Sequence, residues 1–143
     1  MDLRSPALNH FLDQWLDEDL GRGDLTGSAL GDRHGSAYWI AKQSGVFCGG
    51  TLVERIFQRL DRLVKTKLLV SDGKELTKGQ RILELSGPAA ALVAGERTAL
   101  NLAMRLSGIA TATAALVAEL KGTEIQISDT RKTTPGLRLF EKY

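Results

Sequence analysis

The sequence predicts a mixed α/β fold (α+β), because segments of helical and of extended character alternate along its 143 residues. Apolar residues at helical spacing come first. Short segments rich in aromatic and β-branched residues follow, bounded by turn formers. A long segment rich in Ala and Leu, which are strong helix formers, comes next. The predicted order is helix, strand, helix, two strands, long helices and one strand.

The N-terminal segment predicts an amphipathic helix that begins at Ser5. Ser5 suits an N-cap, and Pro6 would occupy the first helical position, where its missing N–H costs nothing. One face of this helix would be apolar, formed by Leu8, Phe11, Leu12, Trp15, Leu16 and Leu20. Residues 18–26, which contain two close glycines, should end the helix and turn the chain.

The middle of the chain predicts a small sheet with one helix. Strands are expected at 35–43, 64–70 and 81–85. The helix is expected at 49–61, with one apolar side formed by Leu52, Val53, Ile56, Phe57 and Leu60. Turns are expected at 71–74 and 77–80.

A long helical region is expected from about 89 to 120, broken or bent near Ser107 and Gly108. Gly122 is placed to end it. Residues 125–128 then predict a short buried strand, and a polar loop and the start of a helix at 137–143 follow. A strand, a loop and a helix open a βαβ unit, which needs a neighbouring strand. We therefore expect the chain to be the front portion of a longer protein.

Composition sets limits on partners and location. The net charge of +2 is too even to predict binding to nucleic acid or to a membrane surface. The N-terminus, Met1 to Pro6, lacks the apolar core of a signal peptide, and no apolar run approaches the roughly 20 residues of a membrane span. The single cysteine, Cys48, excludes an intrachain disulfide and is expected to be buried or inert. A cytoplasmic location is the expectation.

The loop after the last predicted strand is the strongest candidate site. In parallel α/β folds, ligands are bound by loops at the C-terminal ends of strands. Arg131 and Lys132 place two cations there among threonine hydroxyls, and an Arg fork suits a carboxylate or phosphate. An anion site and a solvated basic loop are both compatible with these residues.

A second candidate lies in the segment 95–102, where Glu96, Arg97 and Asn101 interrupt an apolar helix. Charges on a buried helix are costly unless they are paired or reach a site. Arg97 could reach an anion, for example in a neighbouring subunit, or it could pair internally with Glu96. His10 and His34 lie in different elements without cysteine or carboxylate at ligand spacing, so no metal site is expected in this chain. The acidic residues near the end of the first helix read as a solvated cluster.

Six blocks of the sequence occur in an order typical of one family: ED-L-G-R-G-D-L-T at 18–26, G-V-F-C-G-G at 45–50, the glycine turns at 72–73 and 78–79, G-E-R-T-A-L-N-L at 95–102, L-S-G-I-A-T at 106–111 and D-T-R-K-T-T-P-G-L-R at 129–138. Together they cover nearly the whole chain. The sequence resembles quinolinate phosphoribosyltransferases, also called carboxylating nicotinate-nucleotide pyrophosphorylases.

The resemblance implies a fold and an activity. Residues 1–108 would form an open-faced sandwich of sheet and helices that includes dimer-forming helices. Residues 109–143 would contain the first strand of an incomplete α/β barrel. Such enzymes convert quinolinate and PRPP to nicotinate mononucleotide, pyrophosphate and CO2 with Mg2+, in NAD biosynthesis. The chain alone is expected to be inactive, because the family's later substrate and metal residues lie beyond residue 143.

The resemblance also implies roles for residues at an active site that lies at a dimer interface. Arg97 would reach the quinolinate site of the partner subunit. Arg131 and Lys132 would bind the substrate carboxylate and phosphoribosyl groups. Thr130, Thr133 and Arg138 are weaker candidates for substrate contacts. No catalytic residue and no metal ligand is assigned within the chain.

Three alternatives compete with this interpretation. A molybdenum-transport-associated homologue shares the same blocks. A biotinyl or lipoyl carrier has similar glycine turns to those at 72–85, but the lysine that it needs at a hairpin tip is missing. A non-catalytic fragment that only dimerises is compatible with the apolar helix face at 89–120.

Overall fold

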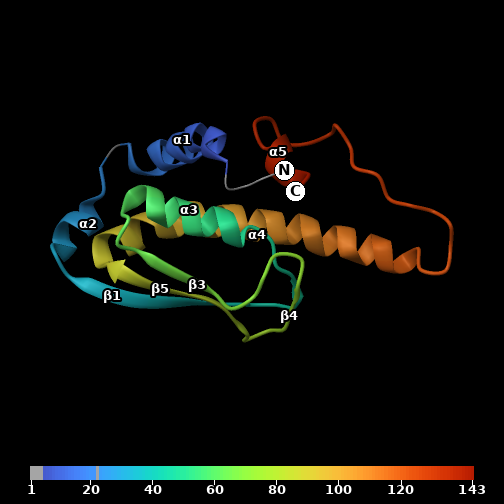
Figure 1. Cartoon of the computed structure of the whole chain (residues 1–143), viewed down its shortest axis with the longest axis horizontal. Helices are drawn as coiled ribbons and strands as arrows, with labels where there is room; N and C mark the ends of the chain where they lie inside the picture. Colours follow the sequence, from blue (N-terminus) through green and yellow to red (C-terminus); the bar gives the residue numbers. More distant parts are fainter. Residues whose placement is uncertain (1–4, 22) are drawn as a thin grey trace.

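A computed structural model describes residues 5–21 and 23–143; Met1 to Arg4 and Arg22, on which the N-terminal and first-block expectations partly rest, lie outside the described residues. The main sheet contains β1 (His34–Ile40), β5 (Arg81–Pro88) and β3 (Lys65–Leu68), in the order β1-β5-β3 with both pairs antiparallel. Figure 1 shows this sheet as one layer, α3 and α4 as the next, and α1 beyond them. The predicted α+β class is confirmed.

One face of the sheet is covered and the other is open. On β5, Leu83 and Leu85 are buried. Glu84, which lies between them, forms ion pairs with Lys67 at 3.5 Å and with Arg81 at 3.4 Å. The Arg81 guanidinium also lies 4.2 Å from the centre of the Tyr38 ring. Because alternate residues of a strand point to opposite faces, the charged residues collect on the open face. This is the open-faced arrangement that the resemblance implied.

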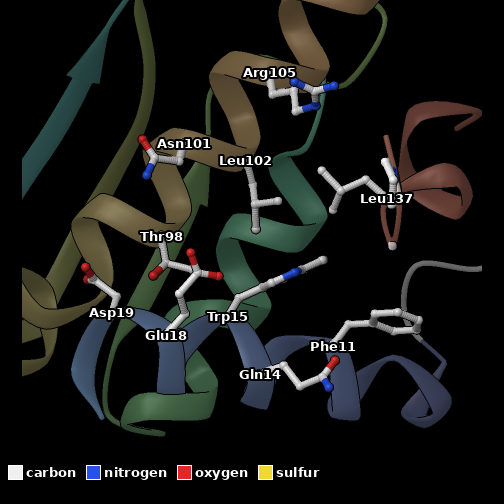
Figure 2. A pocket seen from close by; sticks show the side chains of 12 residues that line it. Phe11, Gln14, Trp15, Glu18, Asp19, Thr98, Asn101, Leu102, Arg105 and Leu137 are labelled. Carbon is white, nitrogen blue, oxygen red and sulfur yellow. The ribbon is translucent and has the colours of Figure 1, made fainter. Parts of the chain in front are cut away.

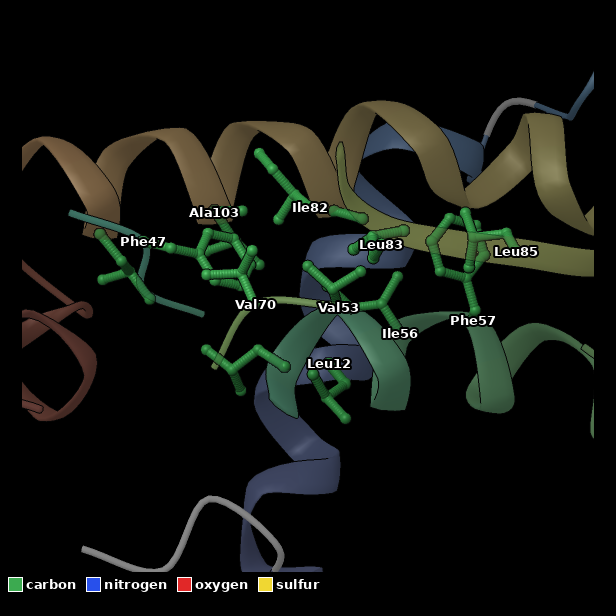
Figure 3. Packing of buried hydrophobic residues seen from close by; sticks show 14 of the residues in the cluster. Leu12, Phe47, Val53, Ile56, Phe57, Val70, Ile82, Leu83, Leu85 and Ala103 are labelled. Carbon is green, nitrogen blue, oxygen red and sulfur yellow. The ribbon is translucent and has the colours of Figure 1, made fainter. Parts of the chain in front are cut away.

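The covered face packs against α3 (Gly50–Leu60) and α4 (Ala89–Glu119). The two helices approach closely at Gly95, where a Cβ atom would lie 2.8 Å from the ring of the fully buried Phe57. Figure 3 shows the core between the helices and β5. Its largest fully buried side chains are Phe47, Phe57, Phe140, Leu12, Leu52, Ile56, Leu83 and Val53.

A second, two-stranded sheet that the sequence did not predict joins β2 (Gly45–Val46) to β4 (Glu75–Leu76). It brings Asp72 to the N-terminus of α3, where its Oδ1 accepts the N–H groups of Gly49 at 2.9 Å and Gly50 at 2.8 Å. Gly49 has a φ of 109°, a conformation that favours glycine. The sequence blocks at 45–50 and 72–73 therefore act together as a helix cap.

Two hydroxyl groups of α4 bind the backbone that follows β2. Thr111 Oγ1 accepts the Val46 N–H at 2.8 Å, and Ser107 Oγ accepts the Cys48 N–H at 3.0 Å and donates to the Cys48 carbonyl at 3.2 Å. Burial, and next the charge of Asp72, raise the pKa of the Cys48 thiol to about 11. A thiol with that pKa is protonated at neutral pH, in agreement with the inert cysteine expected from the sequence.

The N-terminal region differs from its prediction in two details. A 3-10 turn, Pro6–Leu8, precedes α1 (Asn9–Leu20), so the N-cap of the α-helix is Leu8 and not Ser5. The chain then forms α2 (Leu25–Leu30), which was not predicted because it is only six residues long and contains a glycine. The Asp24 side chain caps α2 by accepting the Thr26 N–H at 3.1 Å.

The long helix is continuous, so the predicted break near Ser107 and Gly108 is wrong. One glycine costs a helix only about 1 kcal/mol, which the surrounding Ala and Leu residues offset. By length and composition alone α4 could cross a membrane, although its first half belongs to the core described above. The boundary expected at residue 108 falls inside α4, and the division into 1–108 and 109–143 stays a prediction.

The strand predicted at 125–128 does not form. Ile125 is 64% exposed and Ile127 is 42% exposed, and no strand among the described residues pairs with them. A parallel strand needs a neighbour to satisfy its backbone, so an apolar strand-like segment stays irregular without one. Figure 1 shows the chain leaving the far end of α4 and returning to the short helix α5 (Arg138–Glu141) near α1.

Candidate anion-binding loop

Residues 130–134 form a compact loop that holds itself together. Thr130 Oγ1 accepts the Lys132 N–H at 3.1 Å, and the Arg131 carbonyl accepts the Thr133 N–H at 3.1 Å. Arg138 closes the loop, because its Nε donates to Thr133 Oγ1 at 3.1 Å and its Nη2 donates to the Arg131 carbonyl at 3.2 Å. Thr130, Thr133 and Arg138 therefore shape the loop in this structure.

Arg131 and Lys132 point their charges into solvent. Both are exposed, and within residues 5–21 and 23–143 neither side chain has a hydrogen-bond or ion-pair partner. Two adjacent cations on a backbone that is fixed by Arg138 and by the threonines can receive a carboxylate or phosphate without first breaking an internal ion pair. The structure thus presents the two cations that the sequence singled out.

The loop is tied to α4 by a group of polar residues that sequence reasoning missed. Arg105 Nε donates to Glu141 Oε1 at 2.7 Å, and Arg105 also donates to the hydroxyl of Thr134. Glu141 Oε2 accepts the Thr134 N–H at 3.0 Å. The Thr134 N–H, followed by the Arg105 guanidinium, lowers the pKa of the Glu141 carboxyl. The signal in the sequence was a second arginine in the apolar helix, the same signal that pointed to Arg97.

Arg97 pairs with a carboxylate outside the loop. Its Nε is 3.0 Å from a carboxylate oxygen of Asp19 at the end of α1, and the side chain is 68% exposed. The internal pairing with Glu96 that the sequence left open is not the one that forms.

A half-open cleft of about 480 Å3 separates α1, α4 and residues 135–137 (Figure 2). Glu18, Asp19 and Asn101 line one side of it, Trp15 lies near its centre, and Arg105 and Leu137 lie on the opposite side (Figure 2). Two carboxylates make this cleft a poor anion site, and neither Arg131 nor Lys132 lines it. The candidate site is therefore the loop and not the cleft.

Aromatic packing anchors the segment that carries the loop. Phe140 of α5 is 1% exposed, and its ring centre lies 5.3 Å from that of Phe11 and 4.8 Å from that of Trp15, both in edge-to-face geometry. Such pairs stabilise a contact beyond the area that they bury. The C-terminal residues are thus fixed against α1 although the preceding segment has no sheet partner.

The fold and the loop define a class: an α+β protein with an open-faced sandwich that presents a paired cationic loop beside its helical layer. Two family descriptions match the chain. "Quinolinate phosphoribosyl transferase, N-terminal domain" matches residues 24–107, and "Quinolinate phosphoribosyl transferase, C-terminal domain" matches residues 109–143. The chain belongs to the quinolinate phosphoribosyltransferase family.

Individual relatives agree with this assignment. A probable carboxylating nicotinate-nucleotide pyrophosphorylase of Bacillus subtilis is 50% identical over 137 residues, which are 95% of this chain and 46% of that protein. The human nicotinate-nucleotide pyrophosphorylase is 38% identical over 139 residues, 96% of this chain and 46% of that protein. The crystal structure of NadC from Streptococcus pyogenes superposes with a TM-score of 0.93 at 39% identity, covering 100% of this chain and 52% of that one. The chain spans about half the length of the curated relatives that it matches.

Proposed function

We propose that the chain is part of an enzyme of NAD biosynthesis that transfers phosphoribosyl from PRPP to quinolinate and releases nicotinate mononucleotide, pyrophosphate and CO2. Family membership supports this function. The structural observation that carries it is the fixed loop at 130–134, on which Arg131 and Lys132 are exposed without internal partners.

The chemistry of the proposed substrates suits this loop. Quinolinate carries two carboxylates, which need several fixed cations, and the Arg131 fork can bind one of them through two hydrogen bonds. Lys132 supplies a compact second charge for a carboxylate or for the phosphoribosyl group. Loss of CO2 leaves negative charge on the ring, and cations that are already in place stabilise that charge without reorganisation. Thr130, Thr133 and Arg138 would act by holding these cations in position.

Arg97 fits a role in a second subunit better than a role in its own loop. Its pairing with Asp19 is exposed, and exposed ion pairs are weak, so a substrate anion from a neighbouring copy could replace Asp19. A homodimer, or a higher homo-oligomer, is therefore part of the proposal. Light scattering after size-exclusion chromatography measures the oligomeric state. A monomeric mass at micromolar protein concentration would contradict the proposed homo-oligomer.

Mg2+ stays a prediction taken from the family. No group of three or more His, Cys, Asp or Glu residues that could hold a metal ion comes together in the part of the chain that the structure describes. A cytoplasmic location and the absence of nucleic-acid and membrane partners also stay predictions.

The test is isothermal titration of quinolinate, with and without PRPP and Mg2+. It uses this 143-residue chain and a chimera in which the chain continues from residue 143 into the matching half of the Bacillus subtilis relative. We expect binding and turnover in the chimera only. Arg131→Ala and Lys132→Ala should each abolish binding, whereas Arg62→Ala, which removes an exposed arginine between α3 and β3, should not change it. If the Arg131→Ala and Lys132→Ala chimeras bind quinolinate and form product as well as the unsubstituted chimera does, the loop is not part of the substrate site. If the unsubstituted chimera does not bind quinolinate, quinolinate is not the substrate.

A further inference from the structure

We propose that Arg105 and Glu141 are positioning residues, which hold the loop at 130–134 in the conformation that presents Arg131 and Lys132 to the substrate. This inference rests on the proposed function, and it adds two residues for which neither the sequence nor the resemblance predicted a role. Neither residue needs to touch the substrate. Both would act through Thr134, the last residue of the loop.

The contacts form a closed set around one carboxylate. The Glu141 side chain is 7% exposed, and each of its oxygens accepts a different hydrogen bond. Oε2 accepts one from the Thr134 N–H at 3.0 Å, and Oε1 accepts one from Arg105 Nε at 2.7 Å. The same guanidinium donates to the Thr134 hydroxyl. Thr134 is thus bound through its backbone and through its side chain, from α5 and from α4.

The position of these contacts along the chain explains why they matter. Residues 121–137 contain no helix or strand, so regular structure does not fix the loop. Arg138 binds Thr133 and the Arg131 carbonyl and so links the loop to α5, which packs on α1 through Phe140. Arg105 lies in the long helix α4, beside the buried Leu106, and therefore connects the loop to the rigid core. Binding groups must be fixed to a rigid element if they are to meet the substrate in one geometry.

The chemistry of the pair makes the role specific to these residue types. The guanidinium uses its planar fork to reach Glu141 and Thr134 together, which the point charge of a lysine cannot reproduce. A glutamine at 141 keeps the shape of the side chain but loses the charge that strengthens both hydrogen bonds. Arg105→Lys and Glu141→Gln should therefore make the loop at 130–134 more mobile without leaving a cavity in the core. Arg105→Met should increase the mobility of the loop further.

The first measurement is limited trypsin cleavage of the 143-residue chain, followed by mass spectrometry. Cleavage after Arg131 and Lys132 should be at least about tenfold faster in Arg105→Met and Glu141→Gln than in the wild type, because the tether that fixes the loop is lost. The matched control is Arg59→Met, which breaks a similar exposed pair, Arg59 with Asp13, between α3 and α1. This control should leave cleavage at the loop unchanged. Equal cleavage in all variants would overturn the proposal.

The second measurement gives the functional readout in the chimera. KM for quinolinate should rise about tenfold or more in Arg105→Met and Glu141→Gln, and less in Arg105→Lys, since a small displacement of binding groups weakens binding strongly. The double variant should be no worse than either single variant, because both break one tether. Melting temperatures are recorded alongside, and a lowered melting temperature with unchanged KM would assign the pair a purely structural role and overturn the proposal.

The two measurements separate this inference from the function on which it rests. If the wild-type chimera binds no quinolinate, the proposed function fails, and the positioning of substrate groups fails with it. If quinolinate binds and KM does not respond to Arg105 or Glu141, the proposed function survives and only the positioning role is overturned. Faster cleavage together with a raised KM supports both.

Discussion

The two halves of α4 have nearly the same composition and opposite environments. The part of the helix up to Leu106 supplies its buried residues: Leu92, Gly95, Thr98, Ala99, Leu102, Ala103 and Leu106. The second half extends beyond the sheet (Figure 1), where Leu116 is 60% exposed and Val117 is 49% exposed. Local propensity makes the whole segment helical, but neighbours decide which residues are buried. Pairs of identical substitutions in the two halves can therefore test the structure.

The largest contrast is expected between Leu106→Ala and Leu116→Ala. Leu106 is 3% exposed in the core, and its truncation should destabilise the chain by about 2–5 kcal/mol through lost burial and a cavity. Leu116→Ala should change stability by no more than about 0.5 kcal/mol. Urea denaturation followed by circular dichroism measures both. A cost at Leu116 similar to that at Leu106 would show that the second half is covered in solution, for example by a second copy of the chain.

The same contrast explains which parts of the fold could be predicted from the sequence. Strands 35–43 and 81–85 were predicted nearly correctly because each finds its partner within the chain, as β1 and β5 do. The segment 125–128 has an equally strand-like pattern but no partner among the described residues, so it stays irregular. The strands β2 and β4 were missed because two-residue strands carry no period that a sequence pattern can reveal. The sequence pattern therefore predicts the propensity of a segment to be extended, but the segment forms a strand only where a neighbouring strand pairs with it.

The second contrast compares Gly95→Ala with Gly108→Ala. A Cβ atom at 95 would lie 2.8–2.9 Å from atoms of the buried Phe57 ring, whereas nothing lies within 4 Å of a Cβ atom at 108. Overpacking should make Gly95→Ala destabilising by about 1–3 kcal/mol. The higher helix propensity of alanine offsets part of that cost. Gly108→Ala should stabilise by about 0.5–1 kcal/mol. Thermal denaturation reads both signs, and a stabilising Gly95→Ala would contradict the close approach of α3 and α4.

The third contrast compares Thr111→Val with Thr113→Val, which have the same β-branched shape. Thr111→Val leaves the part-buried Val46 N–H without its acceptor, at a cost of about 1–3 kcal/mol. Thr113 is exposed, and its substitution should stay within about 0.5 kcal/mol. Urea denaturation gives the difference, and hydrogen exchange at Val46 locates it. Slow exchange at Val46 in Thr111→Val would mean that another group binds this N–H.

In the candidate site, too, local features could be predicted from the sequence, whereas long-range contacts could not. Arg131 and Lys132 were predicted because two adjacent cations after an apolar segment form a local signal. The tether of Arg105 and Glu141 was missed, since the two residues are 36 positions apart and meet only when α5 folds back onto α4. The pairing of Arg97 with Asp19, 78 positions away, was missed for the same reason. Long-range polar contacts leave no period in a sequence.

The smallest expected effect concerns the link between the C-terminal segment and the first half of α4, and it depends on pH. The Thr134 N–H and the Arg105 guanidinium lower the pKa of Glu141 below its usual value of 4.5. The ionised carboxylate therefore contributes stability that is fully present above about pH 4.5 and is lost as the pH falls through the lowered pKa of the folded state. Wild type should be more stable than Glu141→Gln at pH 6, and the difference should shrink as the pH falls towards 3. In an Arg105→Met background the difference should be smaller at every pH. Denaturation curves collected across this range measure it, and a gap between wild type and Glu141→Gln that widens on acidification would reverse the assigned sign and place the carboxylate outside the tether.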